Sequence, residues 1–257
     1  MKFTLHILLV GFLVQSSLCF SETKLKFDSK RVVVGETLNY KASWGFLTIG
    51  SATSKIDRNI YNVGTAVCYK IDIAGQTNGL ASIFYVRDKW TSYIDTAVIT
   101  THKAFRSIRE GRYELDELAH FDHVNRKAEV KIYDKKSKSY VLKKVYDTPE
   151  TIRDVIAGFM IFRLMDLEKY SKGELFTING FYEDEGYKIN VVYLGEEYID
   201  TESGKKLCYK VKPIVPKNKV FSGRDAVTVW LAANSAKTIV RIRAKMFVGN
   251  IQIDLLK

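Results

Sequence analysis

The arrangement closest to a metal site in this sequence is His120-Phe-Asp122-His123, which gathers two imidazoles and one carboxylate within four residues. Imidazole and carboxylate groups are common zinc ligands. In an extended strand, however, residues 120 and 123 point to opposite faces, so a shared metal ion would require a turn between them. We therefore favour a solvated loop over a metal site, and we predict that the chain uses no metal ion and no other cofactor.

Residues for nucleophilic catalysis are not gathered anywhere along the chain. Neither Cys68 nor Cys208 has a histidine close to it in sequence, and neither a Gly-x-Ser-x-Gly elbow nor a Gly-rich phosphate loop occurs. Carboxylates for glycoside hydrolysis can come from distant parts of a chain, but Glu183-Asp184-Glu185 is most simply a charged turn. We assign no catalytic residue; the sequence favours a protein that is not an enzyme and leaves the question open.

Four cations and one aromatic residue are the candidates for ligand contacts. Arg163 lies on the apolar stripe of a predicted helix, where it is either a structural ion-pair anchor, the interpretation we favour, or a contact for an anionic headgroup. Arg241, Arg243 and Lys245 alternate with apolar residues and so form a row on one sheet face. A solvated row is favoured, but on a concave surface it would suit phosphate or an acidic sugar. Trp44, if exposed on a curved sheet, would stack on a sugar or grip an acyl chain.

Cys68 and Cys208 both lie inside apolar, strand-like runs. We therefore expect two buried free thiols. A Cys68–Cys208 disulfide stays open as the alternative, because disulfides persist in the compartments that exported proteins reach.

The first residues have the pattern of a secretory signal peptide. Lys2 precedes an apolar run from Leu5 to Val14, and small polar residues follow it. This run is too short to cross about 30 Å of hydrocarbon, so we predict a signal peptide over residues 1–21. Cleavage after Cys19 and cleavage after Ser21 both fit. Lipid attachment at Cys19 is disfavoured because the residues before it do not match a lipoprotein site.

Composition limits the class of partner. The chain has 257 residues, a formal net charge of +11 and 46% hydrophobic residues, enough to build a sizeable core. For an exported protein, a basic surface favours phospholipid headgroups, lipopolysaccharide or other acidic glycans, and we expect no nucleic acid partner. Solubility alone explains the charge equally well.

Most of the chain has the alternation of half-buried antiparallel strands, of which we count about fourteen. Examples are the runs 67–73, 188–193 and 240–246. One segment differs: Thr148-Pro149-Glu150 has the form of a helix start, and an apolar stripe follows it. We predict a mostly β fold with one amphipathic helix at about 149–170.

Two parts of the chain share an order of landmarks. Each has a Gly-Glu pair at its start, then a cysteine, then a tryptophan at the same distance from that cysteine: Gly35, Glu36, Cys68 and Trp90 in one, Gly173, Glu174, Cys208 and Trp230 in the other. We interpret this as a tandem duplication of halves at about 35–111 and 173–250, with added hairpins at 113–147. Residues 22–257 would then form one domain, whose antiparallel sheets make a sandwich or a partly open barrel with the helix packed against it.

These landmarks also resemble a known family. The matching segments are Gly35-Glu36-Thr-Leu-Asn-Tyr40, Trp44-Gly45, Ile49-Gly50, the run 154–163, Gly173-Glu174 and Trp230-Leu231. Together they resemble the bacterial family catalogued as domain of unknown function 3108. The resemblance implies an exported, mostly β envelope protein in the periplasm, with outer-membrane association or secretion as alternatives. It transfers no catalytic residue.

Taken together, these features favour a non-catalytic periplasmic binding or carrier protein for an amphiphilic or anionic envelope ligand: a lipid, a glycolipid or a glycan. One alternative is a structural protein that docks other envelope proteins. A less favoured one is an envelope hydrolase. Peripheral contact with a membrane stays open, and the sequence indicates no oligomeric state.

Overall fold

The computed structural model describes residues 25, 27–28, 31–79, 82, 85–182, 185–214, 223, 225–246 and 249–257. The predicted signal peptide and two residues of the predicted charged turn, Glu183 and Asp184, lie outside this set. Within it, no helix combines the length and the apolar character needed to cross a membrane.

A single antiparallel sheet forms most of the described structure. Its strands are β1 Thr37–Trp44, β2 Leu47–Val63, β3 Ala66–Thr77, β4 Arg87–Asp95, β5 Thr101–Glu110, β6 Tyr113–Asp122, β7 Lys127–Asp134, β8 Ser139–Asp147, β9 Leu175–Tyr182, β10 Glu185–Thr201, β11 Gly204–Pro213, β12 Val227–Ala232, β13 Ile239–Met246 and β14 Gly249–Leu255. The 14 strands follow the order β8 to β1, then β14 back to β9. The last strand therefore returns to pair with the first, and β8 and β9 are the edges.

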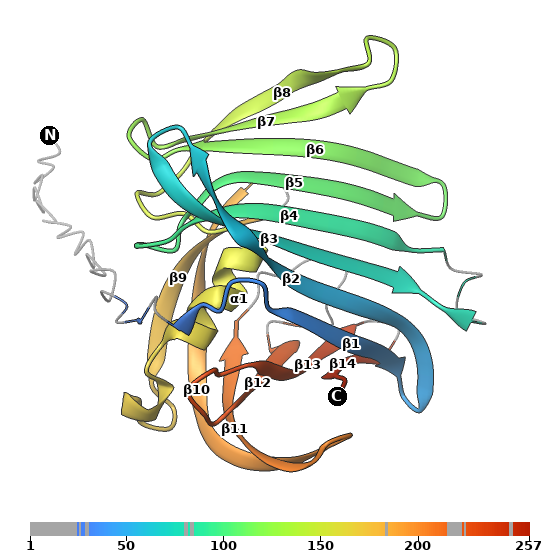
Figure 1. Cartoon of the computed structure of the whole chain (residues 1–257), viewed down its shortest axis with the longest axis vertical. Helices are drawn as coiled ribbons and strands as arrows, with labels where there is room; N and C mark the ends of the chain where they lie inside the picture. The colour runs from blue at the N-terminus through green and yellow to red at the C-terminus, as the bar shows by residue number, and fades with distance from the viewer. Residues whose placement is uncertain are drawn as a thin grey trace, which may run out of the picture.

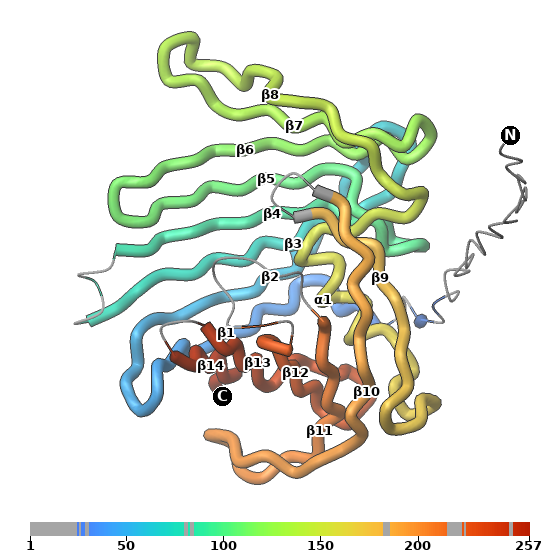
Figure 2. The backbone as a smooth tube through the Cα atoms, turned by 180° about the vertical axis from the view of Figure 1, so that it is seen from behind, coloured from blue at the N-terminus to red at the C-terminus, as the bar shows by residue number. Residues whose placement is uncertain are grey.

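The sheet curls round without closing. Figure 1 shows β4 to β8 as a broad, twisted surface, whereas β9 and β10 run across that direction on the other side of the helix; Figure 2 shows the same from behind. The two longest strands, β2 and β10, each shift register in mid-strand, between Ile56 and Ile60 and between Tyr193 and Glu196. Such bulges bend a strand and increase its twist. The predicted mostly β, antiparallel fold is confirmed, and the sheet resembles the partly open barrel rather than the sandwich.

The helix is shorter than predicted. It spans Val155–Leu164 (α1), and a 3-10 turn at Leu167–Lys169 (η3) follows. The predicted start at Thr148 is wrong because the chain before α1 is extended: Arg153 pairs in parallel with Gly180 of the edge strand β9. The N-cap is Asp154, whose side chain accepts from the Ala157 amide, and Met165 is already extended. The helix therefore ends well before residue 170.

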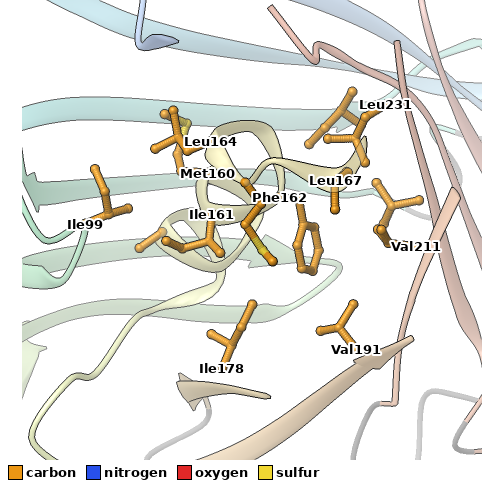
Figure 3. Packing of buried hydrophobic residues seen from close by; sticks show 14 of the residues in the cluster. Ile99, Met160, Ile161, Phe162, Leu164, Leu167, Ile178, Val191, Val211 and Leu231 are labelled. Atoms are coloured by element: carbon orange, nitrogen blue, oxygen red, sulfur yellow. The ribbon is translucent and has the colours of Figure 1, made fainter. Parts of the chain in front are cut away.

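The core gathers around α1, on the sheet face that we call inner. Ile161 and Leu164 of α1, together with Leu167, are almost completely buried among side chains from both arms of the sheet (Figure 3). We call β1 to β8 the first arm of the sheet and β9 to β14 the second. The first arm contributes Ile56, Ile71 and Ile94; the second contributes Phe176, Ile178, Val191, Val211 and Leu231. Because both arms bury apolar surface on the same helix, α1 holds them together.

The start of each predicted half has the same hydrogen bonds. The Gly35 amide donates to Ile56 O and the Ile56 amide to Glu36 O, at 3.0 and 2.9 Å. The Gly173 amide likewise donates to Tyr193 O and the Tyr193 amide to Glu174 O, at 2.7 and 2.9 Å. Both glycines have positive φ, which other residues rarely adopt.

The two tryptophans do not occupy matching positions. Trp90 is paired with Ile73 and packs against the core around α1, on the inner face. Trp230 is paired with Lys210 and belongs to a separate cluster with Ile199 and Cys208 on the opposite, outer face. Equal spacing in sequence thus gives opposite faces in the sheet. The duplication stays a prediction, and residues 113–147 form β6, β7 and β8, which extend the first arm.

Candidate functional site

A groove of about 660 Å³ lies at one end of strands β2 to β6. We call it the polar groove and define it by the side chains of Ser51, Thr53, Gln76, Lys89, Ser107 and Arg109. The register pairs Thr53 with Ala74, Ala74 with Lys89 and Lys89 with Ser107. Because the alternate positions Ile73 and Trp90 face α1, the groove residues face outward.

Small residues make the floor of the groove. Ala52, Ala74 and Gly75 line it beneath the longer polar side chains. Short side chains on β2 and β3 lie next to long ones on β4 and β5, which leaves a trough on this part of the sheet. Tyr85 and Arg87 stand where β4 begins, and both are exposed.

One side of the polar groove is held rigidly. Arg109 donates from Nη2 to Asp116 Oδ2 at 2.6 Å and from Nη1 to the carbonyl oxygens of Ile108 and Leu115. Ser107 donates to the other oxygen of Asp116 at 2.7 Å. Burial raises the pKa of Asp116, but these hydrogen bonds outweigh it, so its pKa is lowered and it stays ionised. Arg109 is therefore a fixed donor rather than a mobile surface cation.

On the other side of the groove, the cations form weaker ion pairs or none that the described structure shows. The Lys89 ammonium approaches Asp72 only to 4.0 Å. Arg87 is exposed and joins no carboxylate in the part of the chain that the structure describes. Together with the nearby hydroxyls and the Gln76 amide, these groups can donate hydrogen bonds to oxygen-rich ligands. Two carboxylates, Asp88 and Glu114, also line the groove.

A second constellation lies on the inner face, at the start of α1. Asp154 is half-buried; Ser92 donates to one of its oxygens, and Thr101 donates to the other at 3.1 Å. Burial raises the pKa of Asp154 despite these hydrogen bonds. The space between this network, Trp90 and Arg106 is about 30 Å³, which is the share of one water molecule in the liquid. The Ser92 hydroxyl is bonded to Asp154 and to no histidine, so the network caps the helix.

Arg163 is the ion-pair anchor that we favoured. Its Nη1 and Nη2 donate to the two oxygens of Glu36 at 2.6 and 2.8 Å. The guanidinium is almost fully buried, and Glu36 immediately precedes β1. The pair therefore ties the last turn of α1 to the first arm of the sheet. Both terminal nitrogens of Arg163 are occupied by Glu36.

The row on β13 is also held within the protein. Arg241 donates to Asp254 and to the carbonyl oxygen of Asp200, and Arg243 donates to Gln252 and lies over the Trp230 ring. Lys245 is exposed near the end of the same strand. These residues are on the outer face but do not line the polar groove. Nor does Trp44, which sits at the tip of the β1–β2 hairpin.

The cysteines and histidines lie apart from the polar groove. Cys68 and Cys208 are buried free thiols, so the disulfide alternative is not what the structure shows. Burial raises the pKa of both thiols to about 11. His123 meets His102 edge to face, with ring centroids 4.6 Å apart, rather than meeting His120. Among the described residues, no group of three or more His, Cys, Asp and Glu side chains could hold a metal ion.

The structure thus does not bring the predicted ligand residues together. Apart from Arg109, which the sequence places in a less regular row with Arg106 and Arg112, it assembles the polar groove from residues that the sequence did not mark, above all Arg87 and Lys89. One local signal was present: Ala74-Gly75 interrupts a strand with small residues, which often means close approach of a ligand or backbone.

Comparison with solved structures matches proteins from three bacteria. A β-barrel-like protein of domain of unknown function DUF1849 from Brucella abortus matches with a TM-score of 0.55 and 10% identity, over 86% of this chain and 95% of that chain. A Bacteroides fragilis protein described as exported, with a YmcC-like fold, matches with a TM-score of 0.36 and 11% identity, over 87% and 94%. A Parabacteroides distasonis protein described as a lipoprotein matches with a TM-score of 0.31 and 12% identity, over the same shares. The first of these likenesses shows the fold alone.

No curated protein matches the sequence. The family model described as protein of unknown function (DUF3108) matches residues 39–256, nearly the whole described sheet. This match agrees with the resemblance drawn from the Gly-Glu, Trp-Gly and helix segments. The chain belongs to the DUF3108 family.

Proposed function

We propose that this chain is an exported, non-catalytic binding protein of the cell envelope that holds an acidic glycan, or the sugar headgroup of a glycolipid, in the polar groove. The observation that carries the proposal is the groove itself: a trough of about 660 Å³ in which three cations, one immobilised and two loosely tied, outnumber the two lining carboxylates, Asp88 and Glu114. Its size falls within the range of small-ligand sites. The signal-peptide pattern of residues 1–21 supports export.

Core side chains fill the inner face of the sheet, so we place the ligand on the outer face. An amphiphile inside the curl of the sheet would need the space that α1 and its contacts occupy (Figure 3). The inner space near Asp154 is only about 30 Å³. The polar groove, by contrast, is open, and its hydroxyl, amide and guanidinium groups match sugar hydroxyls and carboxylates.

Titration calorimetry of the mature protein tests this proposal. The probe is oligogalacturonate, and its methyl-esterified form is the matched ligand without charge. We expect binding of the acid form and at least about tenfold weaker binding by the Arg87→Gln/Lys89→Gln variant, because each charge-assisted hydrogen bond contributes about 1.5–3 kcal/mol. Lys127→Gln/Lys205→Gln, with the same loss of charge outside the groove, should bind normally. Equal binding by both variants would overturn the proposal.

The interaction-protein alternative has one observation in its favour. Strand β8 is an edge of the sheet, and Val141, Leu142 and Val145 on it are exposed. An unpaired edge can accept a strand from another chain. However, Lys143 and Lys144 sit in the same strand, and lysines on edge strands are a common device against such pairing. We therefore rank this function second.

A further inference from the structure

The tip of the β1–β2 hairpin presents three large apolar side chains to solvent. Phe46 is 95% exposed, Leu47 50% and Trp44 47%. No charged residue occurs from Ala42 to Ser54. A cluster of this kind on an exposed tip marks a site of contact with an apolar surface, because exposing large apolar side chains to water is unfavourable.

The tip is rigid. Trp44 and Leu47 are paired across a two-residue turn of Gly45 and Phe46, and Gly45 has the positive φ that such turns require. The Trp44 ring lies directly on Gly249, where a side chain would collide with it. Trp44 is also paired with Ile251 of β14. Trp44 is therefore held by strands on both sides and Leu47 by its pairing with Trp44, while Phe46 projects from the turn between them.

Cations and tyrosines lie at the same end of the sheet as the tip, beyond the intervening strands β3 to β6. Figure 1 shows the β1–β2, β5–β6 and β7–β8 turns at the same end of the sheet, on the right in that view. The β7–β8 turn carries Lys135, Lys136 and Lys138, all exposed, and Lys135 is paired with Glu114. Beside it, Tyr133 and Tyr140 form an edge-to-face pair. Aromatic rings at the headgroup level and basic residues near anionic lipid are how proteins meet a bilayer surface.

We propose that this end of the sheet docks on the surface of an anionic phospholipid bilayer, with Trp44, Phe46 and Leu47 inserted among the headgroups and the β7–β8 lysines lying over them. A convex tip of three side chains is too small for a stable protein interface, which buries about 800 Å² on each partner. An apolar wedge with basic residues at the same end of the molecule fits a lipid interface. The net charge of +11 acts in the same direction.

Docking in this way would place the polar groove at the membrane surface. Ser51 follows the tip on β2, Arg87 is the first residue of β4, and Arg109 is near the end of β5, so the groove opens at the docking end. A ligand bound there would meet the protein at the headgroup layer. The docking itself does not rest on the proposed groove function.

Vesicle flotation of the mature protein tests the docking. The vesicles are phosphatidylethanolamine with phosphatidylglycerol, and phosphatidylcholine is the neutral comparison. We expect binding to the anionic vesicles that weakens with salt, and about a tenfold loss or more for Phe46→Ser/Leu47→Ser. Val124→Ser is the matched control, because Val124 is 91% exposed in the β6–β7 turn at the other end of the sheet.

The outcomes separate docking from ligand binding. Lys136→Gln/Lys138→Gln should weaken binding to anionic vesicles and leave binding to neutral ones unchanged. Ala74→Trp, which fills the polar groove, should abolish oligogalacturonate binding and leave flotation intact. The docking proposal is overturned if the wild-type protein does not float, if Phe46→Ser/Leu47→Ser floats as well as wild type, or if Val124→Ser loses as much.

Discussion

The space around α1 and the polar groove lie on opposite faces of one sheet, and they differ in how fully their side chains are buried. Around α1, Ile161 and Leu164 are almost completely buried, and Arg163 uses its fork on both oxygens of Glu36. In the groove, Lys89 reaches a carboxylate only at 4.0 Å. The inner face holds the two arms together, which leaves the outer face available for a ligand.

The largest effect should come from the inner face. Phe176→Ala removes a ring that is 1% exposed and lies against Phe162 and Tyr170, so we expect a loss of about 4 kcal/mol in the free energy of unfolding. Urea unfolding measures it, with Leu175→Ala, an exposed neighbour on β9, as the control. At temperatures where the variant is folded, oligogalacturonate binding should be unchanged. A folded variant that has lost binding would break the separation of the two faces.

Breaking the Arg163–Glu36 pair should come next. Arg163→Met leaves the Glu36 carboxylate without its partner in a nearly buried site, and we expect a loss of about 3 kcal/mol. Adding Glu36→Met should recover most of that loss, because two apolar side chains can replace a buried pair. A double-mutant cycle by urea unfolding gives the coupling. If the two losses simply add, the pair is not the anchor.

The half-buried carboxylate at the helix start should show in the pH dependence of stability. Burial raises the pKa of Asp154 in the folded protein above its unfolded value of about 3.9. Its contribution is therefore fully present below that value and is lost as pH rises through the folded pKa, by about 1.4 kcal/mol for each unit of difference. Asp154→Asn keeps an N-cap oxygen but cannot ionise. Its stability relative to wild type should rise with pH, as measured by thermal unfolding; a gap that is independent of pH would contradict this.

The smallest change in stability should come from the polar groove. Arg87→Gln/Lys89→Gln removes two outer-face cations that have no close partner in the described structure, so the free energy of unfolding should change by less than about 0.5 kcal/mol. The same variant should lose ligand. A large loss of stability, seen in a thermal melt, would show that these cations serve the fold instead.

Local patterns in the sequence predicted much of this fold. Alternation gave the strands, the apolar stripe gave the helix, and a lone arginine on that stripe indicated a buried ion pair. The start of the helix was missed because it depends on a distant strand: Arg153 pairs with Gly180 and not with the next turn of a helix. A plausible cap at Thr148 cannot reveal that competition.

The polar groove was missed for a related reason. Thr53, Ala74, Lys89 and Ser107 become neighbours only through the register of four strands. Register depends on bulges and turn lengths, which also put Trp90 and Trp230 on opposite faces despite equal spacing from their cysteines. Trp44 was marked for its ring, but not for the tip that presents it.

Hydrogen exchange with and without oligogalacturonate tests the central claim most directly, because it locates the ligand on one face or the other. We predict added protection in residues 51–53, 74–76 and 87–89, at the end of the sheet that forms the polar groove, and no change across Val155–Leu164. Protection of α1 and β9 with none at the groove would place the ligand inside the curl of the sheet and contradict the account.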